Sequence, residues 1–169
     1  MERIDPQPVT DERTALAAYL AYQRATVLTK AAGLDQQQLG ATVAPSSLTL
    51  AGLVKHLAYV EDFWIQAVFL GVPDPEPWAS APFGQDPDWE FHSAPDDSPD
   101  ALVALYVAAA ARTDAALAAH LPDDLSTGTR KRGGPWTLRW IVLHLIEETA
   151  RHAGHADFIR QSIDGAVGE

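Results

Sequence analysis

Four residues that could bind a metal or move a proton fall on one stripe of a predicted helix. Residues 136–164 contain His144, Glu148, His152 and His155, spaced four, four and three positions apart. At about 100° per residue, these side chains lie within an arc of roughly 80°. The stripe is expected to face the protein interior because apolar residues flank it: Ile141, Leu145, Phe158 and Ile159. Three imidazoles and a carboxylate on an inward face are costly to bury without a partner. The stripe therefore predicts a bound metal ion.

Helix geometry limits which of these residues can share one ion. Residues four apart lie about 6 Å apart along the helix axis, whereas His144 and His152 are about 12 Å apart. The pairs His144/Glu148, Glu148/His152 and His152/His155 remain possible. Glu148/His152 is the central pair, and it leaves His144 and His155 a turn to either side as orienting groups. With one more histidine, this pair gives the three-ligand pattern of a catalytic zinc site, whose fourth position is open.

A weak internal repeat supplies that third ligand. Residues 49–57 (TLAGLVKHL) and 137–145 (TLRWIVLHL) are identical at five of nine positions, and the match aligns His56 with His144. Each stretch begins with a threonine suited to cap a helix. We therefore predict His56, Glu148 and His152 as ligands. Taken singly, each histidine is more often structural and Glu148 could pair with arginine, but Glu and His are rarely buried together without a reason.

Four long helices are predicted to position these residues. They cover residues 11–32, 48–70, 99–120 and 136–164, and the third has a strong start in Ser98-Pro99-Asp100. Residues 71–99 form a long, acidic, proline-rich crossover without helical periodicity, expected to pack its aromatic side chains over one end of the helices. We expect residues 1–169 to form one all-α domain, an up-down-down-up four-helix bundle. That order places the second and fourth helices side by side and brings His56 to the stripe.

Composition narrows the classes of partner and compartment. The net charge of −11 argues against nucleic acid or an anionic membrane as a partner. The chain has no cysteine, so a metal must be bound by nitrogen and oxygen. No signal-like segment or membrane-spanning apolar run is apparent, which favours a cytoplasmic protein. The single basic cluster, Arg130-Lys131-Arg132, is interpreted as a solvated loop, with an anion site as the alternative.

The two histidine-bearing stretches resemble the DinB-like superfamily of metal-binding helical bundles. The segments TLAGLVKHLAYVE and LRWIVLHLIEETARHAGHAD are similar to its actinobacterial branch, which is related to mycothiol-dependent enzymes. The resemblance implies His56, Glu148 and His152 as ligands. Glutamate at the first fourth-helix position resembles mycothiol-dependent maleylpyruvate isomerase. That isomerase has a further C-terminal domain that contributes to its active site. Because residues 1–169 are expected to form a single domain, isomerase activity is not carried over.

The resemblance implies a zinc-dependent mycothiol S-transferase acting on small electrophiles. Zinc, nickel or another divalent ion fits the donors. His144 or His155 is expected to accept the thiol proton, and Arg130 and Arg132 to bind an anionic part of the thiol or substrate. The alternative is a non-catalytic metal-containing bundle used for ligand binding or stress response. Aromatic residues expected at the surface, such as Tyr59 and Trp140, predict a homodimer.

Overall fold

The computed structural model describes residues 3–129 and 133–167. Its four long helical segments are α1 (Glu12–Ala31), α3 (Leu50–Asp62) continued by the π-helix η1 (Phe63–Leu70), α5 (Pro99–Ala119) and α6 (Leu138–Asp164). Shorter elements are α2 (Gln36–Leu39), α4 (Trp89–Ser93) and the 3-10 turn η2 (Ala94–Asp96). The described residues contain no strand, only an isolated bridge between Leu125 and Thr137. The all-α prediction is confirmed.

Side-chain caps begin each long helix. Asp11, Thr49, Ser98 and Thr137 each accept a hydrogen bond from the backbone N–H three residues ahead. These bonds satisfy donors that the first helical turn leaves free. The second predicted helix was expected to begin at about Leu48, and Thr49 instead delays the first helical residue to Leu50. Its predicted end is correct, because Gly71 follows η1 with a φ of 66°.

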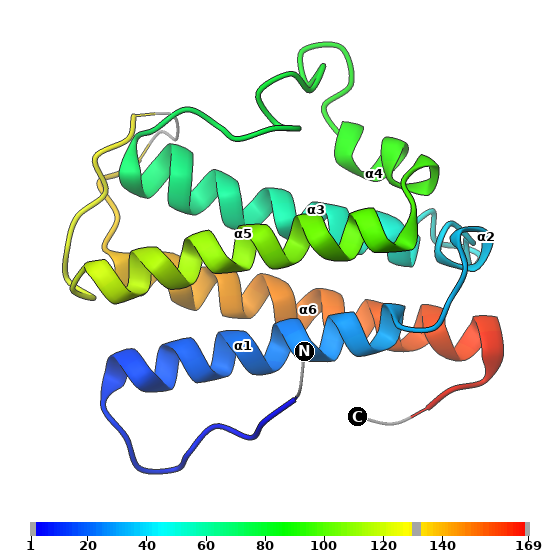
Figure 1. Ribbon diagram of the computed structural model, residues 1–169, viewed down its shortest axis with the longest axis horizontal. Coiled ribbons are helices and arrows are strands. Elements are labelled where there is room, and N and C mark those ends of the chain that lie inside the picture. Colours follow the sequence, from blue (N-terminus) through cyan, green and yellow to red (C-terminus); the bar gives the residue numbers. More distant parts are fainter. Residues whose placement is uncertain (1–2, 130–132, 168–169) are drawn as a thin grey trace.

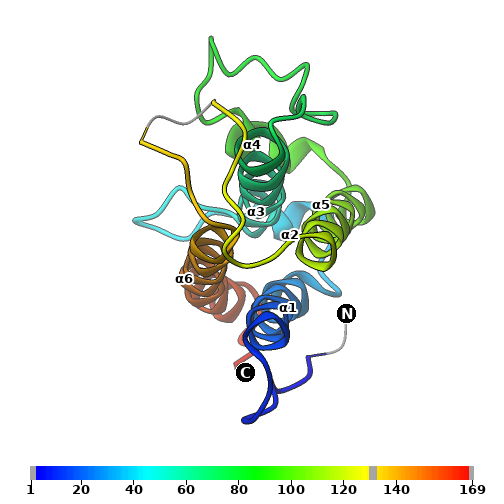
Figure 2. The same ribbon diagram turned by 90° about the vertical axis from the view of Figure 1, so that its left-hand side faces the viewer.

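The long helices lie in two layers. Figure 1 shows α1 and α6 running in one direction and α3, η1 and α5 running in the other. In the end-on view of Figure 2, α3 and α5 lie above α1 and α6, and α4 lies outside α3. The most extensive packing is between α1 and α6 and between α3 and α5, and α3 also contacts α6. This last contact brings His56 towards the histidine stripe.

The segment between η1 and α5 differs from the prediction in two ways. It contains α4 and η2, although its sequence has no helical period. Its backbone passes over the outer side of α3 (Figure 2), and Trp78, Phe83 and Phe91 contact α3 side chains along the helix instead of covering an end of the helices. Trp78 is 2% exposed, and its Nε1 donates to Oδ2 of Asp62 at 2.8 Å. Asp62 also accepts two hydrogen bonds from Arg112 of α5, so this segment is tied to both helices.

Two aromatic residues lie in environments other than those predicted. Phe158 was expected on the inward side of the stripe but is 75% exposed. Tyr59 was expected at the surface and is instead partly buried against Trp78 and Phe83. Trp78 and Phe83 both come from the crossover, whereas Phe63 of η1 also contacts the Tyr59 ring. Its burial was therefore hidden from a prediction that treated the helix alone.

One helix among the described residues, α5, is long and apolar enough to cross a membrane by length and composition, with a mean hydropathy of 1.4. The sequence was expected to contain no such run. Within the fold, one side of α5 is packed against α3, and its buried residues include Leu102, Tyr106 and Leu117. The other side of α5 is open, and Val103 and Val107 are 40% and 43% exposed.

Candidate metal centre

The fold brings together the predicted ligands His56, Glu148 and His152 at the contact between α3 and α6. The ring centroids of His56 and His152 are 5.1 Å apart in an edge-to-face arrangement. Nε2 of His152 lies 3.6 Å from Oε2 of Glu148. Two ligand atoms bound tetrahedrally to one zinc ion are about 3.4 Å apart. The spacing between Glu148 and His152 is therefore close to what a shared ion requires.

Burial prepares His152 to act as a neutral ligand. Its side chain is 12% exposed. Burial lowers the pKa of His152 to about 4, assisted by the nearby rings of His56 and His155, while Glu148 opposes the shift. The imidazole is thus neutral at pH 7. A neutral imidazole has the free lone pair that metal coordination needs.

His155 and His144 lie on either side of this central pair. Nδ1 of His155 is 3.3 Å from Nδ1 of His152, whereas Glu148 lies near the other ring nitrogen, Nε2. His155 therefore supports the orientation of His152. Nε2 of His144 lies 4.0 Å from Oε1 of Glu148, and its ring stacks on Trp140 with centroids 5.3 Å apart. His144 is the better placed of the two to exchange a proton beside Glu148.

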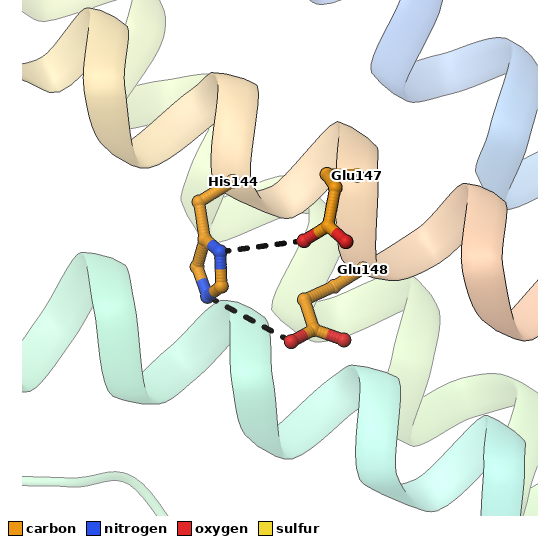
Figure 3. Close-up of side chains that lie close together, drawn as sticks. All are labelled: His144, Glu147 and Glu148. Atoms are coloured by element: carbon orange, nitrogen blue, oxygen red, sulfur yellow. Dashed lines mark ion pairs between the residues drawn. The ribbon is translucent and has the colours of Figure 1, made fainter.

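A second cluster on α6 competes for the same carboxylate. His144, Glu147 and Glu148 offer ligand atoms that all lie within 4.8 Å of one another. Figure 3 shows His144 and Glu148 extending from α6 towards α3, with Glu147 on the same helix. Glu147 is 49% exposed and paired with Arg151. We favour the set with His56 and His152, because its donors are more buried and come from two helices.

Sequence reasoning missed Glu90 of α4. Its side chain is 5% exposed, and its Oε1 lies 2.9 Å from Nδ1 of His56. Its other oxygen, Oε2, is buried without a hydrogen-bond partner among the described residues. A buried carboxylate oxygen in this state is costly, and a bound water would relieve the cost. The residues that fit a metal ion are the neutral imidazole of His152 with Glu148 and His56 beside it. No periodicity in the acidic crossover distinguishes Glu90 from its neighbours.

The remaining predicted residues are separate from this cluster. Arg130 and Arg132 lie outside the described residues. A cavity of about 280 Å³ borders Phe91, whose ring stacks on His56, and it is also lined by Thr49, Asp88 and His92. The larger cavity, about 490 Å³, is lined by residues of α1 and α5 and includes none of the candidate ligands. Neither of these two cavities is lined by His56, Glu148 or His152, and the one of 280 Å³ approaches the candidate centre only through Phe91.

The fold and the site together define a class of protein. It is a helical protein in which two helices share a cluster of histidine and carboxylate side chains. A family model for mycothiol S-transferases matches residues 15–165. The chain belongs to that family, a DinB-like group related to mycothiol-dependent enzymes, which confirms the resemblance seen in the sequence. The family indicates a mycothiol-related transferase activity.

Similarity to individual proteins is more distant. No curated protein matches the sequence significantly. Among solved structures, the crystal structure of a conserved protein from Enterococcus faecalis is similar, with a TM-score of 0.61 over 94% of this chain and 100% of that chain. The two sequences are 15% identical, so this likeness concerns the fold alone.

Proposed function

We propose that this protein is a zinc-dependent mycothiol S-transferase that joins the thiol sulfur to small electrophiles. The observation that carries the proposal is the meeting of His56 from α3 with Glu148 and His152 from α6. These three side chains are the proposed ligands, and zinc or another divalent ion suits their nitrogen and oxygen donors. The match to the mycothiol S-transferase family supports the choice of thiol.

The residues around the centre have separate roles in this proposal. A bound divalent ion would supply the positive charge that favours the thiolate, the nucleophilic form of a thiol. His144 accepts the thiol proton at Nε2, which lies beside Glu148. His155 orients His152 through its Nδ1. Arg130 and Arg132 are proposed to bind an anionic part of the thiol or substrate.

The wider arrangement is also proposed. The directions of α1, α3, α5 and α6 in Figure 1 support an up-down-down-up four-helix bundle with a proline-rich crossover. Trp140, Leu143 and Phe158 of α6 are 45%, 51% and 75% exposed, and these exposed apolar side chains support a homodimer. The net charge of −11 supports a protein that binds neither nucleic acid nor an anionic membrane, and a cytoplasmic location is proposed with it. Sedimentation showing monomer alone at micromolar concentration would refute the dimer.

A cobalt-substituted protein tests the transferase directly. Addition of mycothiol is expected to change the visible spectrum of the bound cobalt, because a thiolate sulfur would enter the coordination sphere. Conjugation of a generic electrophile should require the thiol, disappear with chelator and return with zinc. If cobalt binds but no low-molecular-weight thiol alters its spectrum, the transferase proposal is wrong, and a non-catalytic metal-containing bundle is favoured.

A further inference from the structure

The short helix α4 contacts the side chain of His56 on two sides. Glu90 Oε1 lies 2.9 Å from Nδ1 of His56, and the ring of the next residue, Phe91, stacks on the imidazole with centroids 4.5 Å apart and planes at 24°. We propose that Glu90 is a positioning residue that fixes the tautomer and orientation of His56 for metal binding. This role rests on the metal centre proposed above.

The contact determines which ring nitrogen can bind a metal. A carboxylate oxygen only accepts hydrogen bonds, so Nδ1 of His56 carries the proton and donates it to Glu90. The lone pair of the neutral ring is then on Nε2. Because Phe91 covers one ring face, rotation away from this orientation would break the hydrogen bond and the stacking together. The ring is thereby fixed at its edge and at its face.

The position of α4 itself is fixed by the residue before His56. Nζ of Lys55 donates to Oγ of Ser93 at 2.8 Å and to Oδ2 of Asp97 at 2.6 Å. The same ammonium lies 4.4 Å from the ring centroid of Trp89, at the start of α4. Lys55 is 3% exposed, so these contacts are shielded from water. Two adjacent residues of α3 therefore contact α4. Lys55 fixes its position, and His56 pairs with the carboxylate of Glu90.

A second histidine–carboxylate pair in the same segment provides a control. Nδ1 of His92 lies 2.9 Å from Oδ2 of Asp86, as close as in the pair of His56 and Glu90. The side chain of His92 is 67% exposed, whereas that of His56 is 19% exposed. Loss of Asp86 therefore removes an equivalent hydrogen bond from the same part of the fold without touching the candidate centre.

Cobalt affinity measures the effect of Glu90 without any assay of turnover. Loss of an outer carboxylate that orients a ligating histidine weakens metal binding by roughly 10- to 100-fold. We expect Glu90→Ala to show a loss of that order, Glu90→Gln to restore part of it because its amide oxygen still accepts from Nδ1, and Asp86→Ala to bind cobalt as the wild type does. Circular dichroism should show folded protein for each variant.

The tautomer of His56 provides a second measurement that needs no variant to fold. In the metal-free wild type, nitrogen NMR at a pH where the ring is neutral should show the proton on Nδ1. Proton on Nε2, or unchanged cobalt affinity in folded Glu90→Ala, would overturn the role of Glu90 alone. Absence of cobalt binding by the wild type would instead overturn the proposed metal centre, so the two failures are distinguishable.

Discussion

Glu148 has two possible sets of partners, and this ambiguity decides where a metal would bind. Its Oε2 faces His152 at 3.6 Å, whereas its Oε1 faces His144 at 4.0 Å. The first direction leads to His56 on α3, and the second leads to Glu147 at the surface of α6. An ion held from two helices has more buried donors, and substitution of single residues separates the two sets.

Zinc content of purified variants is the first prediction. His56→Ala and His152→Ala should each lose most of the metal, because either change removes one of three proposed ligands. Glu147→Ala should retain it, since Glu147 is half exposed and paired with Arg151. His92→Ala and His120→Ala are the controls. If Glu147→Ala and His144→Ala lose the metal while His152→Ala keeps it, the ion belongs to the surface cluster.

Part of this chemistry was readable from the sequence. The spacing of Glu148 and His152 depends on helix geometry, which is local. The repeat that aligns His56 with His144 is a match between two stretches of sequence and needs no structure. Glu90 was not readable, because only tertiary packing returns α4 to α3. Phe158 was misjudged for a related reason. It lies on the extended edge of the stripe, and helical periodicity does not report how wide a face the neighbouring helix covers.

The close contact of α3 with α4 depends on a glycine. A Cβ at Gly52 would lie 3.0 Å from Cδ1 of Phe91 and 3.1 Å from Oγ1 of Thr49, the helix cap. Phe91 is itself stacked on His56. A side chain at position 52 would therefore press on both the start of α3 and the ring that covers His56.

A pair of glycine substitutions tests this contact. In an open helical position, glycine to alanine stabilises by about 1 kcal/mol. Gly154→Ala in α6 should show that gain, because a Cβ there meets no atom within 4 Å. Gly52→Ala should instead lower the free energy of unfolding and weaken cobalt binding. Equal stabilisation of both variants in urea titrations would show that Phe91 moves away from the new Cβ without lowering the free energy of unfolding.

The ends of the long helices were predicted better than their junctions. Asp11, Ser98 and Thr137 have side chains that act within three residues, so sequence alone indicates them. The change from α3 to η1 leaves no comparable mark. Nor does α4, whose five residues are too few to establish a period. Elements that depend on contacts with residues far away in the sequence cannot be predicted from local sequence patterns.

Ion pairs centred on the buried side chain of Arg24 join three of the long helices. Arg24 of α1 donates to both oxygens of Glu61 of α3, at 2.7 and 2.6 Å, and to Asp114 of α5 at 2.8 Å. Arg24 and Glu61 are each 1% exposed. Burial alone would lower the pKa of Arg24, but the charges of its two partners raise it above the usual value. The guanidinium is therefore charged in the folded protein.

Breaking that pair should cost far more than a surface substitution. Arg24→Met leaves the carboxylate of Glu61 buried without its cation, and such losses cost about 3–5 kcal/mol. Arg24→Met combined with Glu61→Leu should recover much of the stability, because no buried charge then lacks a partner. Urea unfolding of the two variants provides the comparison. A double variant no more stable than Arg24→Met would contradict this explanation.

The docking of α4 on α3 also bears on the order in which a newly synthesised chain assembles. Residues 50–98 are close in sequence, so His56 can acquire its contacts with Glu90 and Phe91 while the ribosome is still translating the later segments. α6 follows these elements in the chain and carries both remaining proposed ligands. Capture of a metal ion would then be available only to a chain in which α6 has emerged and docked.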